Sequence, residues 1–166
     1  LCHDFGKINI IDTIFVYGRK LLDLEFNIIK SHPSMGKKLL EAHNRTREYV
    51  DVAMGHHKWY DNKGGYPEDF DTSKSPYKTV IDLVLCADCM DAATDTVGRS
   101  YNKGKTLEDF RRELVAGAGT RYAPWLPALL EREEVITDVE FLLNQAREIN
   151  YRDTYNLLKD VQEKGL

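Results

Sequence analysis

The sequence has little of several features that define other classes of protein. Cysteine occurs three times in 166 residues, an odd number and too few for a disulfide scaffold, which fits a reducing compartment. Apolar runs extend over only a handful of residues, well short of the ~20 that a membrane-spanning helix needs. The net charge is −4, so no global cationic field attracts a nucleic-acid duplex. We therefore expect a cytoplasmic protein with no membrane segment in this chain and no duplex partner.

The length and composition suit one globular domain. Apolar residues make up 42% of the chain and charged residues 30%, and 166 residues can bury a sizeable core. The chain does not begin with methionine, and Leu1-Cys2 lead directly into a sequence motif. We therefore expect it to be a domain of a longer protein, with N-terminal helices missing.

Two-residue apolar alternation and hairpin turn signals are also lacking, which predicts an all-α fold. The helical patterns begin with the end of a helix at 1–8 and a short helix at 23–30. Ser31 is the predicted N-cap of a helix that extends to Leu40, with Pro33 in its first turn. Further helices are predicted at 46–57, 77–97, 106–116, 135–143 and 147–163, with a main loop at 58–75. The pattern Thr106-Leu-Glu-Asp109 predicts a capped helix start.

Four of the five histidines lie in three short motifs. These are His3-Asp4, His32-Pro33-Ser34-Met35-Gly36 and His56-His57. A carboxylate, Asp88, continues the apolar stripe of the 77–97 helix, where it costs several kcal/mol unless it is paired or bound to a metal. Imidazole nitrogen together with carboxylate oxygen suits iron, manganese or zinc. The pattern predicts a metal site, whereas the fifth histidine, His43, is predicted to be solvated.

Each motif alone also has an ordinary structural interpretation. His3-Asp4 could be a surface pair, His32 a histidine at a helix start, and His56-His57 one buried and one solvent-facing residue. Lys7 follows His3 by one helical turn and could hold a phosphate oxygen beside a metal. Cys86-x-x-Cys89 has no second cysteine pair, so we interpret its cysteines as small apolar residues of a helix.

Taken together and in order, the motifs resemble the HD-GYP subfamily of HD-domain phosphohydrolases. His3-Asp4-Phe5-Gly6-Lys7-Ile8 is similar to the family motif HD-I-G-K-I, and the segment from Ile11-Asp12-Thr13-Ile14 to Ser31-His32-Pro33-Ser34-Met35-Gly36 to the segment that ends in H-P-x-x-G. The stretch from His56 to Pro67 resembles H-H-E-x-x-D-G-x-G-Y-P, and Ala87-Asp88-Cys89-Met90-Asp91-Ala92 resembles A-D-x-x-D-A. Arg99-Ser100-Tyr101 is similar to R-P-Y, and the segment Gly119 to Pro124 to G-T-x-F-D-P.

The resemblance implies an HD-domain helical bundle with a metal site between core helices. It assigns 1–130 to an HD-GYP-like catalytic domain and 131–166 to a C-terminal helical extension packed on it. The implied cofactors are two, or three, divalent ions, iron or manganese, with Asp4 as the bridging ligand. The implied metal ligands are His3, Asp4, His32, His56, His57 and Asp88.

The implied activity is metal-dependent hydrolysis of cyclic di-GMP to pGpG or GMP. A metal-bridging hydroxide would attack phosphorus in line, while the metals and Lys7 stabilise the transition state and the 3′ oxygen leaves. The implied catalytic residues are Lys7 and the bridging ligand Asp4. The implied substrate contacts are Lys7, Asp91, Arg99, Lys103 and Lys105. The motif loop of Asp61, Gly65, Tyr66 and Pro67 would shape the cleft or dock a partner such as a diguanylate cyclase domain.

Several positions depart from the family pattern. Lys58 replaces the glutamate of H-H-E, Asn62 replaces a glycine, and one residue is inserted before Gly65-Tyr66-Pro67. Two alternatives to the hydrolase therefore stay open. One is a catalytically degenerate signalling module that binds a cyclic dinucleotide or a cyclase partner, and the other is a phosphohydrolase with a different nucleotide substrate. The C-terminal helices are compatible with internal packing or with a homodimer.

Overall fold

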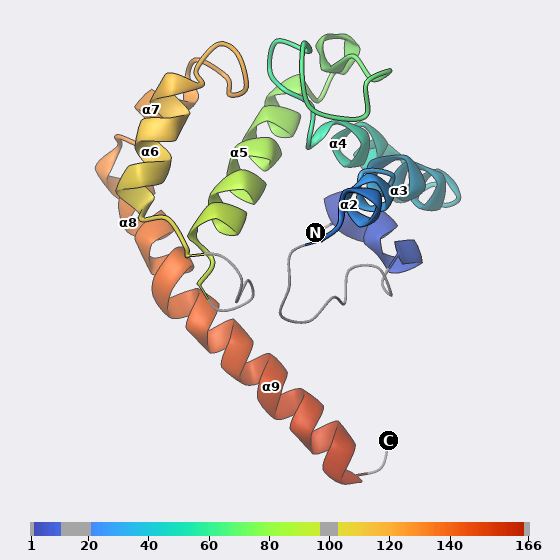
Figure 1. Ribbon diagram of the computed structural model, residues 1–166, viewed down its shortest axis with the longest axis vertical. Coiled ribbons are helices and arrows are strands. Elements are labelled where there is room, and N and C mark those ends of the chain that lie inside the picture. The colour runs from blue at the N-terminus through green and yellow to red at the C-terminus, as the bar shows by residue number, and fades with distance from the viewer. Residues whose placement is uncertain (1, 11–20, 97–102, 165–166) are drawn as a thin grey trace. The chain divides into compact units, whose positions relative to one another are not determined.

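The computed structural model describes residues 2–10, 21–96 and 103–164, and these residues form helices joined by loops (Figure 1). Within these ranges the only β-type pairings are two isolated bridges, Lys58 with Gly65 and Ala118 with Tyr122. The predicted all-α class is confirmed. The chain divides into two compact units, Leu1–Pro127 and Ala128–Leu166.

The first unit contains most of the helices. They are the 3₁₀ helix η1 (Cys2–Ile10), α2 (Asp23–Ile29), α3 (His32–Glu41), the 3₁₀ turn η2 (Arg47–Tyr49), α4 (Val50–Gly55), the 3₁₀ turn η3 (Thr72–Lys74), α5 (Lys78–Thr94) and α6 (Leu107–Ala116). The short α7 (Leu126–Leu129) spans the division between the units. The second unit contains α8 (Glu133–Phe141), a π-helical turn η4 (Leu142–Ala146) and α9 (Arg147–Lys164).

Helix starts follow the sequence signals with one correction. Thr106 and Asp109 form the predicted capping box at the start of α6, with Thr106 Oγ1 accepting from the Asp109 backbone N–H at 3.0 Å. Ser31 stands at the N-cap of α3, but its hydroxyl does not cap the helix. It donates instead to the Ile28 carbonyl at 2.6 Å, because its backbone is already helical at the junction between α2 and α3.

The predicted helix at 46–57 is shorter and divided. A 3₁₀ turn (η2) leads into α4, which ends at Gly55 with His56 as its C-cap. Val50, Ala53 and Met54 are buried, at the i, i+3, i+4 spacing of one helical face. Within a helix, successive side chains point about 100° apart, so helical geometry sets the direction of each side chain only up to the last helical residue. His57, which was predicted to be the last residue of this helix, therefore lies beyond the helical path.

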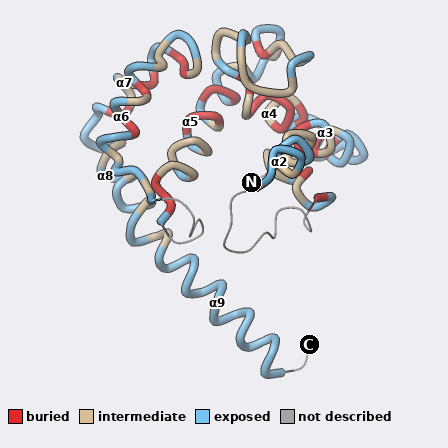
Figure 2. The backbone as a smooth tube through the Cα atoms, viewed as in Figure 1, coloured by how far each residue is buried: buried red, intermediate tan, exposed pale blue. Residues whose placement is uncertain are grey.

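The core of the first unit lies between helices that pack in chain order. η1 packs against α3, α3 against α4, α4 against α5, and α5 against α6. Fully buried apolar side chains from successive helices fill these contacts (Leu40, Ala53, Ile81, Leu85, Phe110, Leu114). Figure 2 draws the buried stretches of the backbone in red. Burial of large apolar side chains at about 1.5–3 kcal/mol each holds these helices together.

Two glycines let η1 approach α3 closely. A Cβ added to Gly6 would lie 1.8 Å from the His32 carbonyl oxygen and 2.6 Å from Gly36 N, distances that no side chain can occupy. Gly36 faces this contact from α3. Because His3 and Asp4 come just before Gly6, the close approach brings them against His32 at the start of α3.

The second unit, taken by itself, is built around α9. Every described residue of this helix after Arg147 is exposed, as the pale blue tube in Figure 2 shows. The predicted packing of 131–166 on the catalytic domain stays a prediction. None of the described helices combines the length and the apolar character that crossing a membrane demands.

Candidate metal centre

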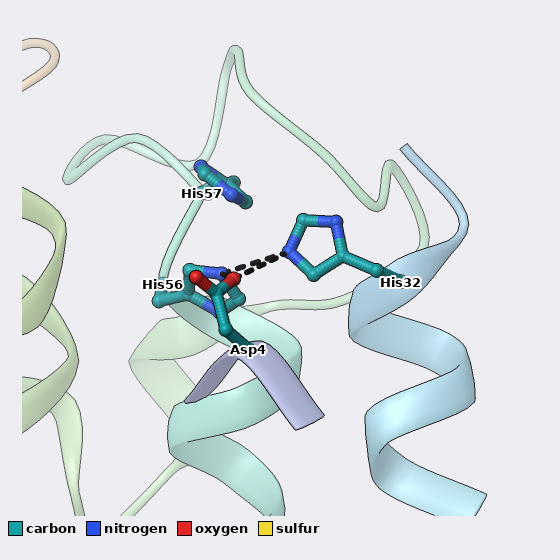
Figure 3. Close-up of side chains that lie close together, drawn as sticks. All are labelled: Asp4, His32, His56 and His57. Atoms are coloured by element: carbon teal, nitrogen blue, oxygen red, sulfur yellow. Dashed lines mark hydrogen bonds and ion pairs between the residues drawn. The ribbon is translucent and has the colours of Figure 1, made fainter. Parts of the chain in front are cut away.

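Four predicted ligands from different elements converge on one point (Figure 3). Asp4 comes from η1, His32 from the start of α3, and His56 and His57 from the end of α4. Each offers a ligand atom within 4.8 Å of the other three. Asp4 Oδ1 lies 3.4 Å from His32 Nε2 and 3.7 Å from His56 Nε2. Four nitrogen and oxygen donors at this spacing can surround one divalent ion.

Two of the imidazoles are oriented by backbone carbonyls. His32 Nδ1 lies 2.7 Å from the Ile29 carbonyl, and His56 Nδ1 lies 2.8 Å from the Ala53 carbonyl. Each carbonyl therefore accepts a hydrogen bond from Nδ1–H, so the proton stays on Nδ1 and the Nε2 lone pair faces the centre. Metal-binding histidines are commonly fixed in this way.

A second group shares Asp4 with the first. His3, Asp4 and Asp88 bring three ligand atoms within 4.8 Å of one another. His3 Nε2 lies 3.4 Å from Asp4 Oδ2 and 3.9 Å from Asp88 Oδ1. His57 Nδ1 lies 3.8 Å from Asp88 Oδ2, so His57 adjoins both groups. Asp4 therefore directs one carboxylate oxygen toward each group.

The residues fit a metal for a physical reason. His32 Nε2 and His56 Nε2 are only 3.0 Å apart, although each presents a lone pair to the other. Asp4 Oδ1 is buried beside them and has no hydrogen-bond partner within the described part of the chain. A buried acceptor without a donor costs about 1–3 kcal/mol. A cation among these three atoms would remove the repulsion and satisfy the orphaned oxygen.

Burial and neighbouring groups keep the ligands in their metal-binding forms. Desolvation, followed by repulsion from His56, lowers the pKa of His57 to about 2, and desolvation lowers the pKa of His32 to about 4. Both rings are therefore neutral at neutral pH. Burial alone would raise the pKa of Asp4, but the His3 imidazole and the Lys7 ammonium hold it well below its usual range.

Lys7 lies at the edge of the centre. Its Nζ donates to Asp4 Oδ2 at 2.7 Å, and its side chain keeps about a third of its surface exposed. The ammonium has two further N–H groups that are directed away from this bond. It can therefore contact an anion that approaches the ligands from solvent.

The other predicted substrate contacts are not part of these groups. Asp91 is exposed on α5, one turn beyond Asp88, and Lys103 is exposed after the second gap in the described chain. Lys105 Nζ contacts Glu113 Oε2 of α6 at 2.5 Å. Arg99 lies outside the described residues. Their roles toward substrate stay predictions.

The motif loop folds back over His57. Tyr66 N–H donates to the His57 carbonyl at 3.2 Å, and the Tyr66 ring stacks on the His57 imidazole with centroids 4.5 Å apart and planes at 27°. Gly65, with φ +76°, permits the return, since a Cβ there would lie 2.0 Å from the His57 carbonyl oxygen. Burial, followed by the nearby carboxylates of Asp88 and Asp4, raises the pKa of Tyr66, so its phenol stays protonated.

The departures from the family motif lie in the scaffold of this loop. Lys58 is buried, and its Nζ donates to the Glu68 carbonyl at 3.1 Å. Asn62 has a φ of +60°, a left-handed conformation that asparagine tolerates better than most residues. Its Oδ1 accepts from Thr72 N at 2.9 Å and Thr72 Oγ1 at 3.0 Å. Asp61 N–H donates to the Thr120 carbonyl, which fastens the loop from the other side.

Sequence reasoning missed a polar network next to Asp88. Arg121 Nη2 lies 3.1 Å from Cys89 Sγ on α5, and Arg121 Nη1 lies 3.1 Å from Glu113 Oε1 on α6. Tyr122 OH also donates to Glu113 Oε1, at 3.2 Å. The network ties the helical turn of Asp88 to α6. No local pattern signals it, because its members are 8 to 32 residues apart in the chain.

Comparison with known proteins gives an independent indication of kinship. The chain is 34% identical over 140 residues to a cyclic di-GMP phosphodiesterase of Thermotoga maritima, a match that covers 82% of this chain and 37% of that protein. It is 32% identical over 124 residues to the cyclic di-GMP phosphodiesterase response regulator RpfG of Xanthomonas campestris, covering 74% of this chain and 32% of that protein.

A third relative has a different named substrate. The 3′3′-cGAMP-specific phosphodiesterase 2 of Vibrio cholerae is 33% identical over 130 residues, covering 77% of this chain and 24% of that protein. No family model matches the chain. The chain spans 37% of the length of the first of these relatives, 32% of the second and 24% of the third. It is thus a homologue of one segment of proteins that are named cyclic-dinucleotide phosphodiesterases.

Proposed function

We propose that this chain is an HD-GYP-type catalytic domain that hydrolyses cyclic di-GMP with the help of two divalent metal ions. The observation that carries the proposal is the pair of ligand groups that share Asp4, with its buried oxygen Oδ1 lacking a donor. The names of the relatives support a cyclic dinucleotide as the substrate. Their greater length supports a catalytic domain, residues 1–130, within a larger signalling protein.

The chain's own residues would bind and orient the phosphodiester. His32, His56, His57 and Asp4 would hold one ion, and His3, Asp4 and Asp88 the other. Bound iron or manganese supplies Lewis-acid stabilisation of negative charge and a nucleophile that forms at neutral pH. The depressed pKa values of His32 and His57 keep these rings available as ligands.

Lys7 would act on the phosphate directly. Its ammonium is fixed by Asp4 Oδ2 and is partly exposed, so it can donate to a non-bridging oxygen as charge develops there. A Lys7→Met variant should keep its metal and lose roughly a hundredfold in kcat, the typical effect of removing one charge-stabilising donor. Lys38→Met, on the exposed part of α3, is the matched control and should keep wild-type turnover.

The first experiment tests turnover. The purified chain is loaded anaerobically with Fe(II), or with Mn(II), and incubated with cyclic di-GMP, and the products are separated by chromatography. We expect linear pGpG or GMP, and we expect both to disappear when a chelator is added. His57→Ala and Asp4→Ala should give no product while circular dichroism reports a folded helical protein. Full turnover by either variant would contradict the metal assignment.

Two other functions predict different results in the same assay. A degenerate signalling module would bind cyclic di-GMP or a cyclase partner at the motif loop and form no product. Lys58 and Asn62 first suggested this function, but both bond within the loop, to Glu68 and Thr72, which favours an intact centre. A change of substrate would instead give faster hydrolysis of 3′3′-cGAMP, the substrate in the name of one relative.

A further inference from the structure

The His57 ring is held in a different way from its two neighbours. His32 and His56 each place Nδ1 against a backbone carbonyl, at 2.7 and 2.8 Å. The described residues provide no such carbonyl for His57, whose Nδ1 lies 3.8 Å from a carboxylate oxygen of Asp88. Its ring face instead lies against the ring of Tyr66. Something other than a backbone hydrogen bond must therefore set the orientation of this imidazole.

The Tyr66 ring is close enough to do so. The two centroids are 4.5 Å apart and the planes differ by 27°, which is an offset-stacked arrangement. The His32 ring, 5.0 Å away and nearly perpendicular, borders the same imidazole from another side. Rotation of the His57 ring about its Cβ–Cγ bond would drive its edge into the tyrosine plane. The stack therefore limits the ring to a narrow range of orientations.

Tyr66 itself is fixed by the backbone of the loop. Its N–H donates to the carbonyl of His57, so the stacking ring and its target are joined through one hydrogen bond. Lys58 and Gly65 form a bridge one step further out, and the Lys58 ammonium, buried under the loop, holds the Glu68 carbonyl. These contacts fasten the loop that carries Tyr66 at several points next to the ring stack.

We propose that Tyr66 is a positioning residue for the metal centre, and that its ring holds the His57 imidazole in the orientation that binds the ion. In this role the stack replaces the carbonyl hydrogen bond that orients His32 and His56. The proposal rests on the proposed function, because His57 is a ligand only if the centre binds metal. It goes further because it assigns the orientation of the His57 imidazole to contact with the Tyr66 ring, and not to the Tyr66 hydroxyl.

Metal affinity is the direct test, measured by competition with a chromophoric chelator and by elemental analysis. Tyr66→Leu removes the stack and should weaken Mn(II) binding by roughly 10- to 100-fold, the usual loss when a group that orients a ligand is removed. Tyr66→Phe keeps the ring and should bind Mn(II) nearly as tightly as the wild type. Tyr77→Leu changes a tyrosine that lies outside the cluster and should leave metal affinity unchanged.

A double variant separates positioning from general damage to the loop. If Tyr66 acts through His57, the double variant His57→Ala/Tyr66→Leu should bind metal no more weakly than His57→Ala alone. Additive losses would overturn the proposal, as would wild-type affinity in Tyr66→Leu or an equal loss in Tyr66→Phe. Thermal unfolding of Tyr66→Leu in chelator, compared with the wild type, checks that the variant is folded.

The outcomes also separate this proposal from the proposed function. A wild type that binds Mn(II) but leaves cyclic di-GMP intact contradicts the hydrolase, whereas the affinities of the Tyr66 variants still decide the positioning role. A wild type that hydrolyses cyclic di-GMP, together with Tyr66→Leu of unchanged affinity, contradicts only the positioning role.

Discussion

His32 Nε2 and His56 Nε2 lie 3.0 Å apart, while the Nδ1 atom of each ring faces a backbone carbonyl three residues earlier in the chain. The carbonyls fix the tautomers, so two lone pairs point at each other across a buried gap. In a protein without metal this arrangement is unfavourable. It becomes favourable when a cation lies between the rings and the adjacent Asp4 Oδ1.

Metal should therefore stabilise the fold. An ion that binds only the native state adds about 2.7 kcal/mol when its free concentration is about 100 times Kd. We expect Mn(II) to raise the melting temperature and a chelator to reverse the rise, as measured by differential scanning calorimetry. His32→Ala should abolish the metal-dependent rise, and His43→Ala, which alters an exposed histidine, should keep it. A wild-type melting temperature that is indifferent to metal would refute a centre at this position.

Gly6→Ala should destabilise the protein and weaken the metal centre together. The new Cβ would overlap the His32 carbonyl oxygen, at 1.8 Å, so η1 must move away from α3. Overpacking of this kind costs about 1–3 kcal/mol. Gly36→Ala is the matched control, since its Cβ meets nothing nearer than 3.3 Å and alanine favours a helix. The free energy of unfolding of both variants is measured in urea. An equal loss of stability in the two variants would contradict the close approach at Gly6.

Lys78 and Asp82 form an ion pair on the first turns of α5, and Asp82 is almost fully buried. Burial is the largest influence on the Asp82 carboxyl and raises its pKa despite the lysine. Lys78→Met should destabilise by roughly 3 kcal/mol, because a buried carboxylate is left without its partner. The double variant Lys78→Met/Asp82→Leu should recover much of the loss in chemical denaturation. No recovery would mean that the cost lies in the contact of Lys78 with the Tyr60 ring.

Cys86 should behave as a buried apolar residue, and not as a redox-active thiol or a zinc ligand. Burial raises the pKa of its thiol to about 12, against an ordinary value of 9.0. The native state thus retains this proton when the unfolded state has lost it, and the stability from Cys86 is complete below pH 9 and falls toward pH 12. In Cys86→Ala the alkaline fall should be smaller. Iodoacetamide at pH 8, followed by peptide mass spectrometry, should leave Cys86 unmodified in the native protein.

Local sequence patterns were sufficient to predict most helices and the identity of the clustered residues. The capping box at Thr106 works because it depends only on residues three apart on one helix. The burial of Val50, Ala53 and Met54 follows from helical periodicity. The helix predicted to reach His57 ends at Gly55, and the loop beyond it returns to His57 through the Tyr66 N–H, a contact that helical periodicity does not encode.

Sequence patterns alone were enough to predict the all-helical fold and the residue types that cluster in the candidate metal centre. These depend on propensity, apolar spacing and ligand chemistry, which act over a few neighbouring residues. Three further features emerge only from the folded structure: Asp4 faces both ligand groups, Lys58 bonds into the loop, and Tyr66 stacks on His57. Each of these contacts depends on the packing of η1, α3, α4 and α5, and on the close approach at Gly6. Contacts set by packing between distant segments have no signature in the local pattern of a single chain.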